Sequence, residues 1–97
     1  MTEFDIKLQS CMLCDALVRN INNNFFNISF GIREDKMIIV KFILTMISAI
    51  EEDLIDDIIA EYSATQDTNC VLSPVIVKLG ENILPLDNIV YSVRGNG

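Results

Sequence analysis

The segment from Ile47 to Tyr62 constrains the fold more than any other part of the chain. Its apolar residues recur at intervals of three and four, with acidic residues between them. This is the period of an α-helix with one apolar face and one wet face. Ser48 and Glu51 have the spacing of a capping box, which predicts a helix start near Ala49. Such a helix needs a second layer on which its apolar face packs. The predicted apolar stripe comprises Ile47, Ile50, Leu54, Ile55, Ile58, Ile59 and Tyr62.

Residues 3–22 carry a second helical pattern. We place Ile6, Leu13, Cys14, Leu17, Val18 and Ile21 on the buried face of this helix and Asp5, Gln9, Asp15, Arg19 and Asn20 on its wet face. The short alternation of Phe4, Ile6 and Leu8 leaves a strand open as an alternative, with Ser10 as the cap of a later helix. The asparagines of residues 20–24 are predicted to end the helix, because Asn side chains compete for backbone hydrogen bonds.

Cys11 and Cys14 form a C-x-x-C pair within this helix. The spacing occurs in redox dithiols and in zinc sites. A redox pair normally opens a helix after a strand, whereas this pair lies inside one. With Cys70 as the remaining cysteine and no histidine, the chain cannot complete a thiolate and imidazole zinc site by itself. We therefore predict that both cysteines are small core residues, with redox chemistry as the alternative.

Four segments have the pattern of β-strands. In residues 26–33, Phe26, Ile28, Phe30 and Ile32 alternate with Asn27, Ser29, Gly31 and Arg33, which predicts one buried and one wet face. Residues 37–44 are apolar on both faces apart from Lys41, as expected of a central strand. Pro74 indicates that residues 71–79 form an edge strand or contain a bulge, because proline cannot donate a hydrogen bond to a sheet. After a turn at residues 80–82, residues 89–94 are predicted to form the last strand.

These elements predict a single domain over residues 1–97. Their order is helix, hairpin, helix, hairpin, which predicts an α+β fold of two layers, with two helices on one face of a four-stranded antiparallel sheet. A chain of 97 residues supports one modest core. We expect no signal peptide, and the apolar run at residues 37–50 contains Lys41 and is too short to span a membrane. These features predict a soluble, cytoplasmic protein.

The negative charge of the chain is concentrated in one window. The formal net charge is -7, and residues 42–77 contain seven acids but no Lys or Arg. The rest of the chain is formally neutral, and six of the seven acids lie in residues 51–61. Such a field attracts a basic partner and repels nucleic acid and anionic membranes. We therefore expect neither nucleic acid nor a membrane as a partner.

Groups that perform catalysis are scarce in this sequence. It contains no histidine and no glycine-rich phosphate-binding motif. We therefore expect no enzymatic activity and no bound cofactor or metal. The acidic face leaves open a divalent cation site on Asp53, Asp56, Asp57 and Glu61, or a face that is only solvated. We favour a face that binds protein, with Glu52, Asp53, Asp56, Asp57 and Glu61 as the contact residues.

Apolar side chains on the second face of the predicted sheet are candidates for an anchor. Met37, Ile39 and Ile43 alternate along the central strand. An apolar anchor supplies affinity that a charged rim alone does not provide. Burial of these side chains under a loop or against a second copy of the chain is the alternative interpretation.

The order of elements and several local segments resemble small bacterial immunity proteins, which protect a cell from toxins of contact-dependent growth inhibition and related polymorphic toxin systems. The resemblance covers most of the chain, including the segments NISF at residues 27–30, EDK at residues 34–36, EEDLIDD at residues 51–57 and LPLDNIVYSVR at residues 84–94. It implies a non-catalytic cytoplasmic protein that binds its cognate toxin one to one. Together with the charge, it predicts a basic toxin, such as a nuclease, whose active site is occluded by the acidic helix. A small adaptor or a homodimeric regulatory or structural protein is the alternative.

Overall fold

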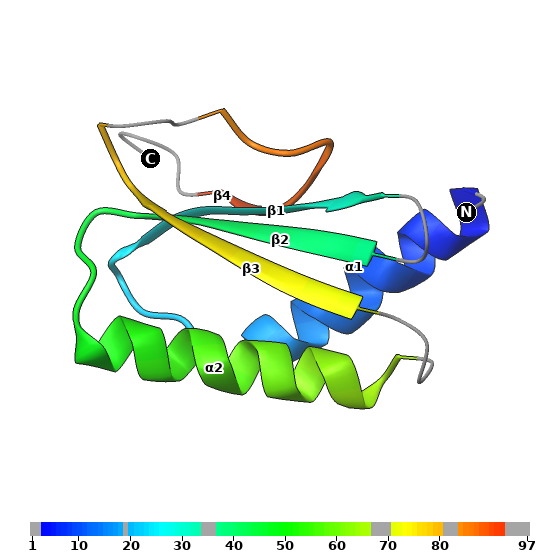
Figure 1. Cartoon of the computed structure of the whole chain (residues 1–97), viewed down its shortest axis with the longest axis horizontal. Coiled ribbons are helices and arrows are strands. Elements are labelled where there is room, and N and C mark those ends of the chain that lie inside the picture. The colour runs from blue at the N-terminus through cyan, green and yellow to red at the C-terminus, as the bar shows by residue number, and fades with distance from the viewer. Residues whose placement is uncertain (1–2, 19, 34–36, 67–70, 81–83, 93–97) are drawn as a thin grey trace.

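A computed structural model describes residues 3–18, 20–33, 37–66, 71–80 and 84–92. The elements are α1 (Glu3–Leu17), β1 (Phe25–Ile32), β2 (Met37–Leu44), α2 (Ala49–Ala64), β3 (Val71–Lys78) and β4 (Asn88–Ser92). Both helices lie on the same side of the sheet, so the fold has two layers (Figure 1). The predicted α+β class and the four strands are confirmed.

The sheet is mixed, and the prediction of a purely antiparallel sheet is wrong. Its strand order is β3-β2-β1-β4, with β3 parallel to β2 and the other two pairs antiparallel. The predicted second hairpin does not form, because β3 and β4 lie on opposite edges of the sheet. The physical reason is α2, which carries the chain back along the sheet after β2. A helical crossover of this kind joins parallel strands, whereas a hairpin joins antiparallel ones.

The core lies between the sheet and the two helices. Alternate residues of β2 face it, and they meet fully buried side chains from β1 and α2. The rings of Phe25 and Phe42 pack edge to face, with centroids 6.3 Å apart. A register shift after Phe25 brings this residue into the core, while Phe26, the predicted core residue, is only half-buried. The fully buried members are Leu13, Phe25, Ile28, Phe30, Ile38, Val40, Phe42, Leu44, Ile58 and Tyr62.

The second face of β1 is buried, and the prediction that it is wet is wrong for Asn27, Ser29 and Gly31. The chain between β3 and β4 must reach the opposite edge of the sheet, and its residues 84–86 lie over the face that the helices leave open (Figure 1). We call residues 84–86 of this connection the strap. Arg33, in contrast, is exposed as predicted.

Two hydrogen bonds hold the strap on the second face. The backbone N–H of Leu86 donates to Ser29 Oγ at 2.8 Å, and Lys41 Nζ donates to the carbonyl of Leu84 at 2.6 Å. A Cβ placed on Gly31 would lie 3.8 Å from Leu86 Cβ, an ordinary van der Waals distance, so the strap lies directly over Gly31. Ile43 is fully buried on the same face. Its interpretation as an exposed anchor is therefore wrong, whereas Met37 remains 39% exposed and Ile39 is half-buried.

Removing the hydroxyl of Ser29 tests how strongly the strap is held. Ser29→Ala leaves the part-buried N–H of Leu86 without its acceptor, which we expect to cost about 1 kcal/mol of unfolding free energy. Ser92→Ala is the matched control, because Ser92 lies in the same sheet and is exposed. Urea unfolding measures both changes, and hydrogen exchange at the Leu86 amide locates the effect. Equal stability of the two variants would show that this hydrogen bond does not hold the strap.

The first helix is shorter than predicted, and some of the residues predicted for its buried face are exposed. It starts at Glu3 as expected, and no strand forms at its beginning, but it ends at Leu17 instead of residue 22. Val18 is 74% exposed, and Cys11 and Cys14 are exposed too. The prediction of both cysteines as core residues is therefore wrong, and Cys70 lies outside the described residues. The polar side chains of Gln9 and Asn20, predicted to be wet, are buried instead.

Strand and helix boundaries otherwise follow the sequence closely. The structure confirms β2 as a central strand and β3, with Pro74, as an edge strand. Gly80 has a φ of 105°, a backbone conformation that favours glycine in a turn. Residues 81–82 of the predicted turn and residues 93–94 of the predicted last strand lie outside the described residues. Neither described helix is long and apolar enough to cross a bilayer.

Candidate functional site

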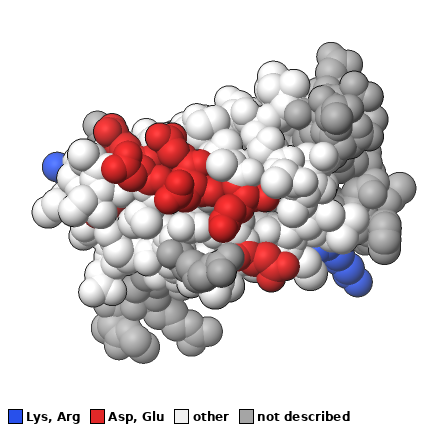
Figure 2. Space-filling view, turned by 90° about the horizontal axis from the view of Figure 1, so that it is seen from below, with Lys and Arg blue, Asp and Glu red and all other residues white. Residues whose placement is uncertain are grey.

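The predicted contact residues all lie on α2 and are all exposed. We call them the acidic ridge: Glu52, Asp53, Asp56, Asp57 and Glu61. Figure 2 shows carboxylates following one another along this side of the molecule, with cationic side chains in view only at its margins among the described residues. The ridge therefore presents a continuous negative surface on a rigid helix. Ile47 and Ile50, predicted for the apolar stripe, are 38% and 65% exposed. Ile47 precedes the helix, whereas Ile50 lies in its first turn and points to solvent.

Glu51 precedes the ridge in the sequence but does not belong to it. Its side chain is only 2% exposed. It accepts hydrogen bonds from the backbone N–H of Ser48 at 2.9 Å, from Asn22 Nδ2 at 2.8 Å and from Asn24 Nδ2 at 2.9 Å, and from the Ser48 hydroxyl. The predicted capping box is confirmed. The two asparagines are an addition that the sequence did not reveal, and they tie the turn before β1 to the first turn of α2.

These hydrogen bonds lower the pKa of Glu51 from its usual 4.5 to about 2, with the Ser48 side chain as the largest cause and those of Asn24 and Asn22 next. A carboxylate with a lowered pKa stabilises the fold fully above the pKa of the unfolded chain and loses this contribution as the pH falls toward the folded value. The contribution of Glu51 is therefore present above about pH 4.5 and disappears toward pH 2.

We expect Glu51→Gln to destabilise the protein clearly at pH 7 and much less near pH 2.5. Glutamine keeps the shape of the side chain but removes the charge that strengthens the hydrogen bonds from Ser48 and the two asparagines. Glu52→Gln is the matched control, because Glu52 is the next residue in the sequence and its side chain is exposed on the ridge. Urea unfolding as a function of pH measures the difference between these variants. If the difference in unfolding free energy between Glu51→Gln and Glu52→Gln does not depend on pH, the charge of Glu51 does not stabilise the fold.

A buried polar network joins the two helices. The hydroxyl of Tyr62 donates to Gln9 Oε1, and Gln9 Nε2 donates to Gln66 Oε1 at 2.8 Å. Nearby, Asn20 Nδ2 donates to the carbonyl of Ala16 at 2.8 Å and to Glu61 Oε2 at 2.7 Å. These contacts explain why Gln9 and Asn20 are buried, since both side-chain amides have hydrogen-bond partners, in each case including one on α2. They also fix the orientation of Glu61, at the end of the acidic ridge nearest α1.

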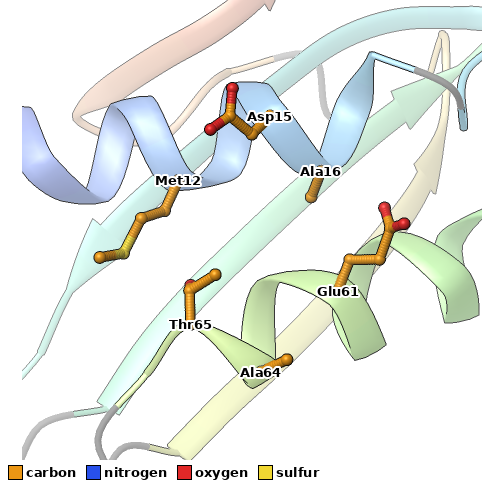
Figure 3. A pocket seen from close by; sticks show the side chains of 6 residues that line it. All are labelled: Met12, Asp15, Ala16, Glu61, Ala64 and Thr65. Atoms are coloured by element: carbon orange, nitrogen blue, oxygen red, sulfur yellow. The ribbon is translucent and has the colours of Figure 1, made fainter.

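A pocket opens between the helices beside this end of the ridge. Its volume is about 280 Å³, and Figure 3 shows side chains from both helices around it. The lining residues are Met12, Asp15 and Ala16 from α1, and Glu61, Ala64 and Thr65 from the end of α2. Asp15 is thus brought beside the ridge, although it was not among the predicted contact residues. Its place on the polar face of the first helix was visible in the sequence, but its position relative to α2 depends on how the helices pack.

The chemistry of the ridge is that of an anionic surface. Within the described ranges, no three Cys, Asp or Glu side chains are grouped to hold a metal ion. The arrangement can form ion pairs and charge-assisted hydrogen bonds with several cationic groups along one helix.

Comparison of the chain with protein-family models and with curated proteins found no match.

Proposed function

We propose that the protein is an immunity protein that neutralises a basic toxin by covering its active site. It binds one toxin domain per chain, in the cytoplasm, and performs no catalysis. The observation that carries this proposal is the acidic ridge, whose five carboxylates are exposed on one helix within a window that contains no Lys or Arg. The resemblance of the element order and of segments such as residues 51–57 to immunity proteins supports the same function.

The mechanism is electrostatic complementarity. A nuclease holds the phosphate backbone of its substrate with Lys and Arg side chains. A row of carboxylates on a rigid helix opposes the same cationic side chains, raises the rate of association and excludes the nucleic acid. Because α2 is anchored by Ile55, Ile58 and Tyr62 in the core, the ridge is ordered before the partner arrives. A preordered surface loses less conformational entropy on binding.

A direct test is the isolation of the complex. We expect the protein to bind the C-terminal domain of a large exported protein encoded directly upstream, in a one-to-one complex seen by size-exclusion chromatography with light scattering. Addition of the protein should also abolish the activity of that domain. Failure to form a complex with this domain, or turnover of a substrate by the protein alone, would overturn the proposal.

A second candidate, self-association, is favoured by exposed apolar side chains at one edge of the sheet. Val71 and Val75 of β3 are 52% and 39% exposed, and Met37 pairs with Val71 in the sheet register. Together they form an apolar strip on the second face. A homodimer that buries this strip remains dimeric without any partner. Light scattering of the protein alone at micromolar concentration distinguishes the candidates, because the immunity function requires no dimer.

A further inference from the structure

We propose that the pocket between α1 and α2 receives one lysine or arginine side chain of the partner. The inference rests on the proposed function, because it names the group that anchors the basic partner at the end of the acidic ridge. It is carried by three properties of the pocket: an apolar wall, two flanking carboxylates from different helices, and a size that fits one side chain.

The apolar wall suits the methylene stem of a basic side chain. Ala16 is buried, Met12 is half-buried and Ala64 is exposed at the mouth. Lysine and arginine side chains bury their stems along apolar surface while their charged ends stay near water or anions. A small anion or a metal ion makes no use of such a wall.

The charges around the pocket favour a cation. Asp15 of α1 and Glu61 of α2 both line it, and Figure 3 shows that they stand on the two opposing helices. Asn20 binds one oxygen of Glu61, Oε2, and orients the carboxylate.

The end of α2 adds to this field. Ala64 and Thr65 belong to the C-terminal end of the helix, where the helix dipole is negative. The last turn of α2 contains no basic residue that opposes this dipole. Lysine and arginine are favoured at such helix ends. A cation from a partner therefore meets negative potential from two carboxylates and from a helix terminus.

The size of the pocket indicates a single side chain. Its volume of about 280 Å³ lies just below the range of about 300–1,000 Å³ that is typical of small-molecule sites. A second hollow of about 200 Å³ lies on the other flank of α1. It is lined by Cys14, Leu17, Val18, Ile21, Val90 and Tyr91, with no acidic residue. This acid-free hollow is an internal control for the effect of charge.

The first test uses small probes and the protein alone. N-acetyl-arginine amide and N-acetyl-lysine amide are titrated while backbone amides are followed by NMR. We expect saturable shifts at Met12, Ala16 and Ala64, and none at Val90 and Tyr91. N-acetyl-citrulline amide, which has the shape of the arginine probe but no charge, should bind at least about tenfold more weakly. Absence of saturable shifts at the pocket, or equal binding of the citrulline probe, would overturn the inference.

The second test fills the pocket without changing the charge. Ala64→Leu places a larger side chain in the mouth, whereas Ala60→Leu makes the same change at an exposed position of α2 outside the lining. We expect Ala64→Leu to remove the saturable shifts and Ala60→Leu to retain them. Asp15→Asn should weaken binding of both cationic probes at least about threefold, by removal of one flanking charge. Equal probe binding by Ala64→Leu and Ala60→Leu would contradict the assigned site.

Binding of the toxin separates this inference from the proposed function. If Ala64→Leu binds the toxin domain with the affinity of the unmodified protein, the pocket is not an anchor, while the immunity function stands. If neither the unmodified protein nor any variant binds the toxin domain, the proposed function fails, whatever the small probes show. A loss of toxin affinity of at least about tenfold in Ala64→Leu alone would support both proposals.

Discussion

Reversal of three charges on the acidic ridge, Asp53→Lys, Asp56→Lys and Asp57→Lys together, is expected to weaken toxin binding at least about 100-fold. All three side chains are exposed, so the fold should remain intact. The affinity falls because the introduced lysines would repel the Lys and Arg side chains of the partner. Isothermal titration or surface plasmon resonance measures the affinity, and circular dichroism with thermal melting confirms that the variant is folded.

Single substitutions locate the effect on the ridge. Asp57→Lys and Asp87→Lys each change the net charge by the same amount, and both positions are exposed, but Asp87 lies between the strap and β4. We expect Asp57→Lys to weaken binding much more than Asp87→Lys. For the unmodified protein, the association rate should fall steeply with salt, since the screening length drops from about 8 Å at 0.15 M to about 3 Å at 1 M ionic strength. Equal effects of the two variants would indicate long-range charge alone, without contact at the ridge.

Replacement of Tyr62 is expected to have the largest effect on stability. Its side chain is fully buried, packs in the core and binds Gln9. Tyr62→Ala creates a cavity and should cost about 3–5 kcal/mol, by analogy with other large aromatic side chains. Small domains are stable by only about 5–15 kcal/mol, so this variant should be partly or wholly unfolded at 37 °C.

Tyr62→Phe separates the hydrogen bond from the packing. It keeps the ring but leaves Gln9 Oε1 without its donor, which should cost about 1–3 kcal/mol. The double variant Tyr62→Phe with Gln9→Leu should recover part of this loss, because both polar partners are then removed. Urea unfolding measures the free energy of unfolding of the unmodified protein, of Tyr62→Phe and of the double variant. A Tyr62→Phe variant as stable as the unmodified protein would mean that this part of the network between the helices contributes nothing to stability.

The features that could be predicted from the sequence are those set by nearby residues. The capping box of Ser48 and Glu51 and the exposure of Asp53 and Asp56 depend on spacing within one helix. The apolar character of β2 likewise made its central position predictable. Local period and propensity determine such features whatever the rest of the chain does.

The features that could not be predicted depend on which elements become neighbours. Residue spacing does not reveal the direction of β3, because a strand has the same pattern in parallel and antiparallel pairs. The burial of Gln9 and Asn20 requires hydrogen-bond partners on α2, more than 40 positions further along the chain. For the same reason, polarity alone placed these two residues on the wrong face of the first helix.

The place of β4 in the sheet affects the order in which the strands pair during synthesis of the protein. β4 pairs with β1, and Ile28 is the register partner of Tyr91. This edge of the sheet is therefore complete only when the C-terminal part of the chain has been made. Loop closure over this separation is slow compared with formation of the hairpin of β1 and β2. During synthesis on the ribosome, the unpaired edge of β1 therefore stays open until residues 88–92 have emerged from the exit tunnel. If the protein has the immunity function that we propose, newly made chains protect the cell only after that delay.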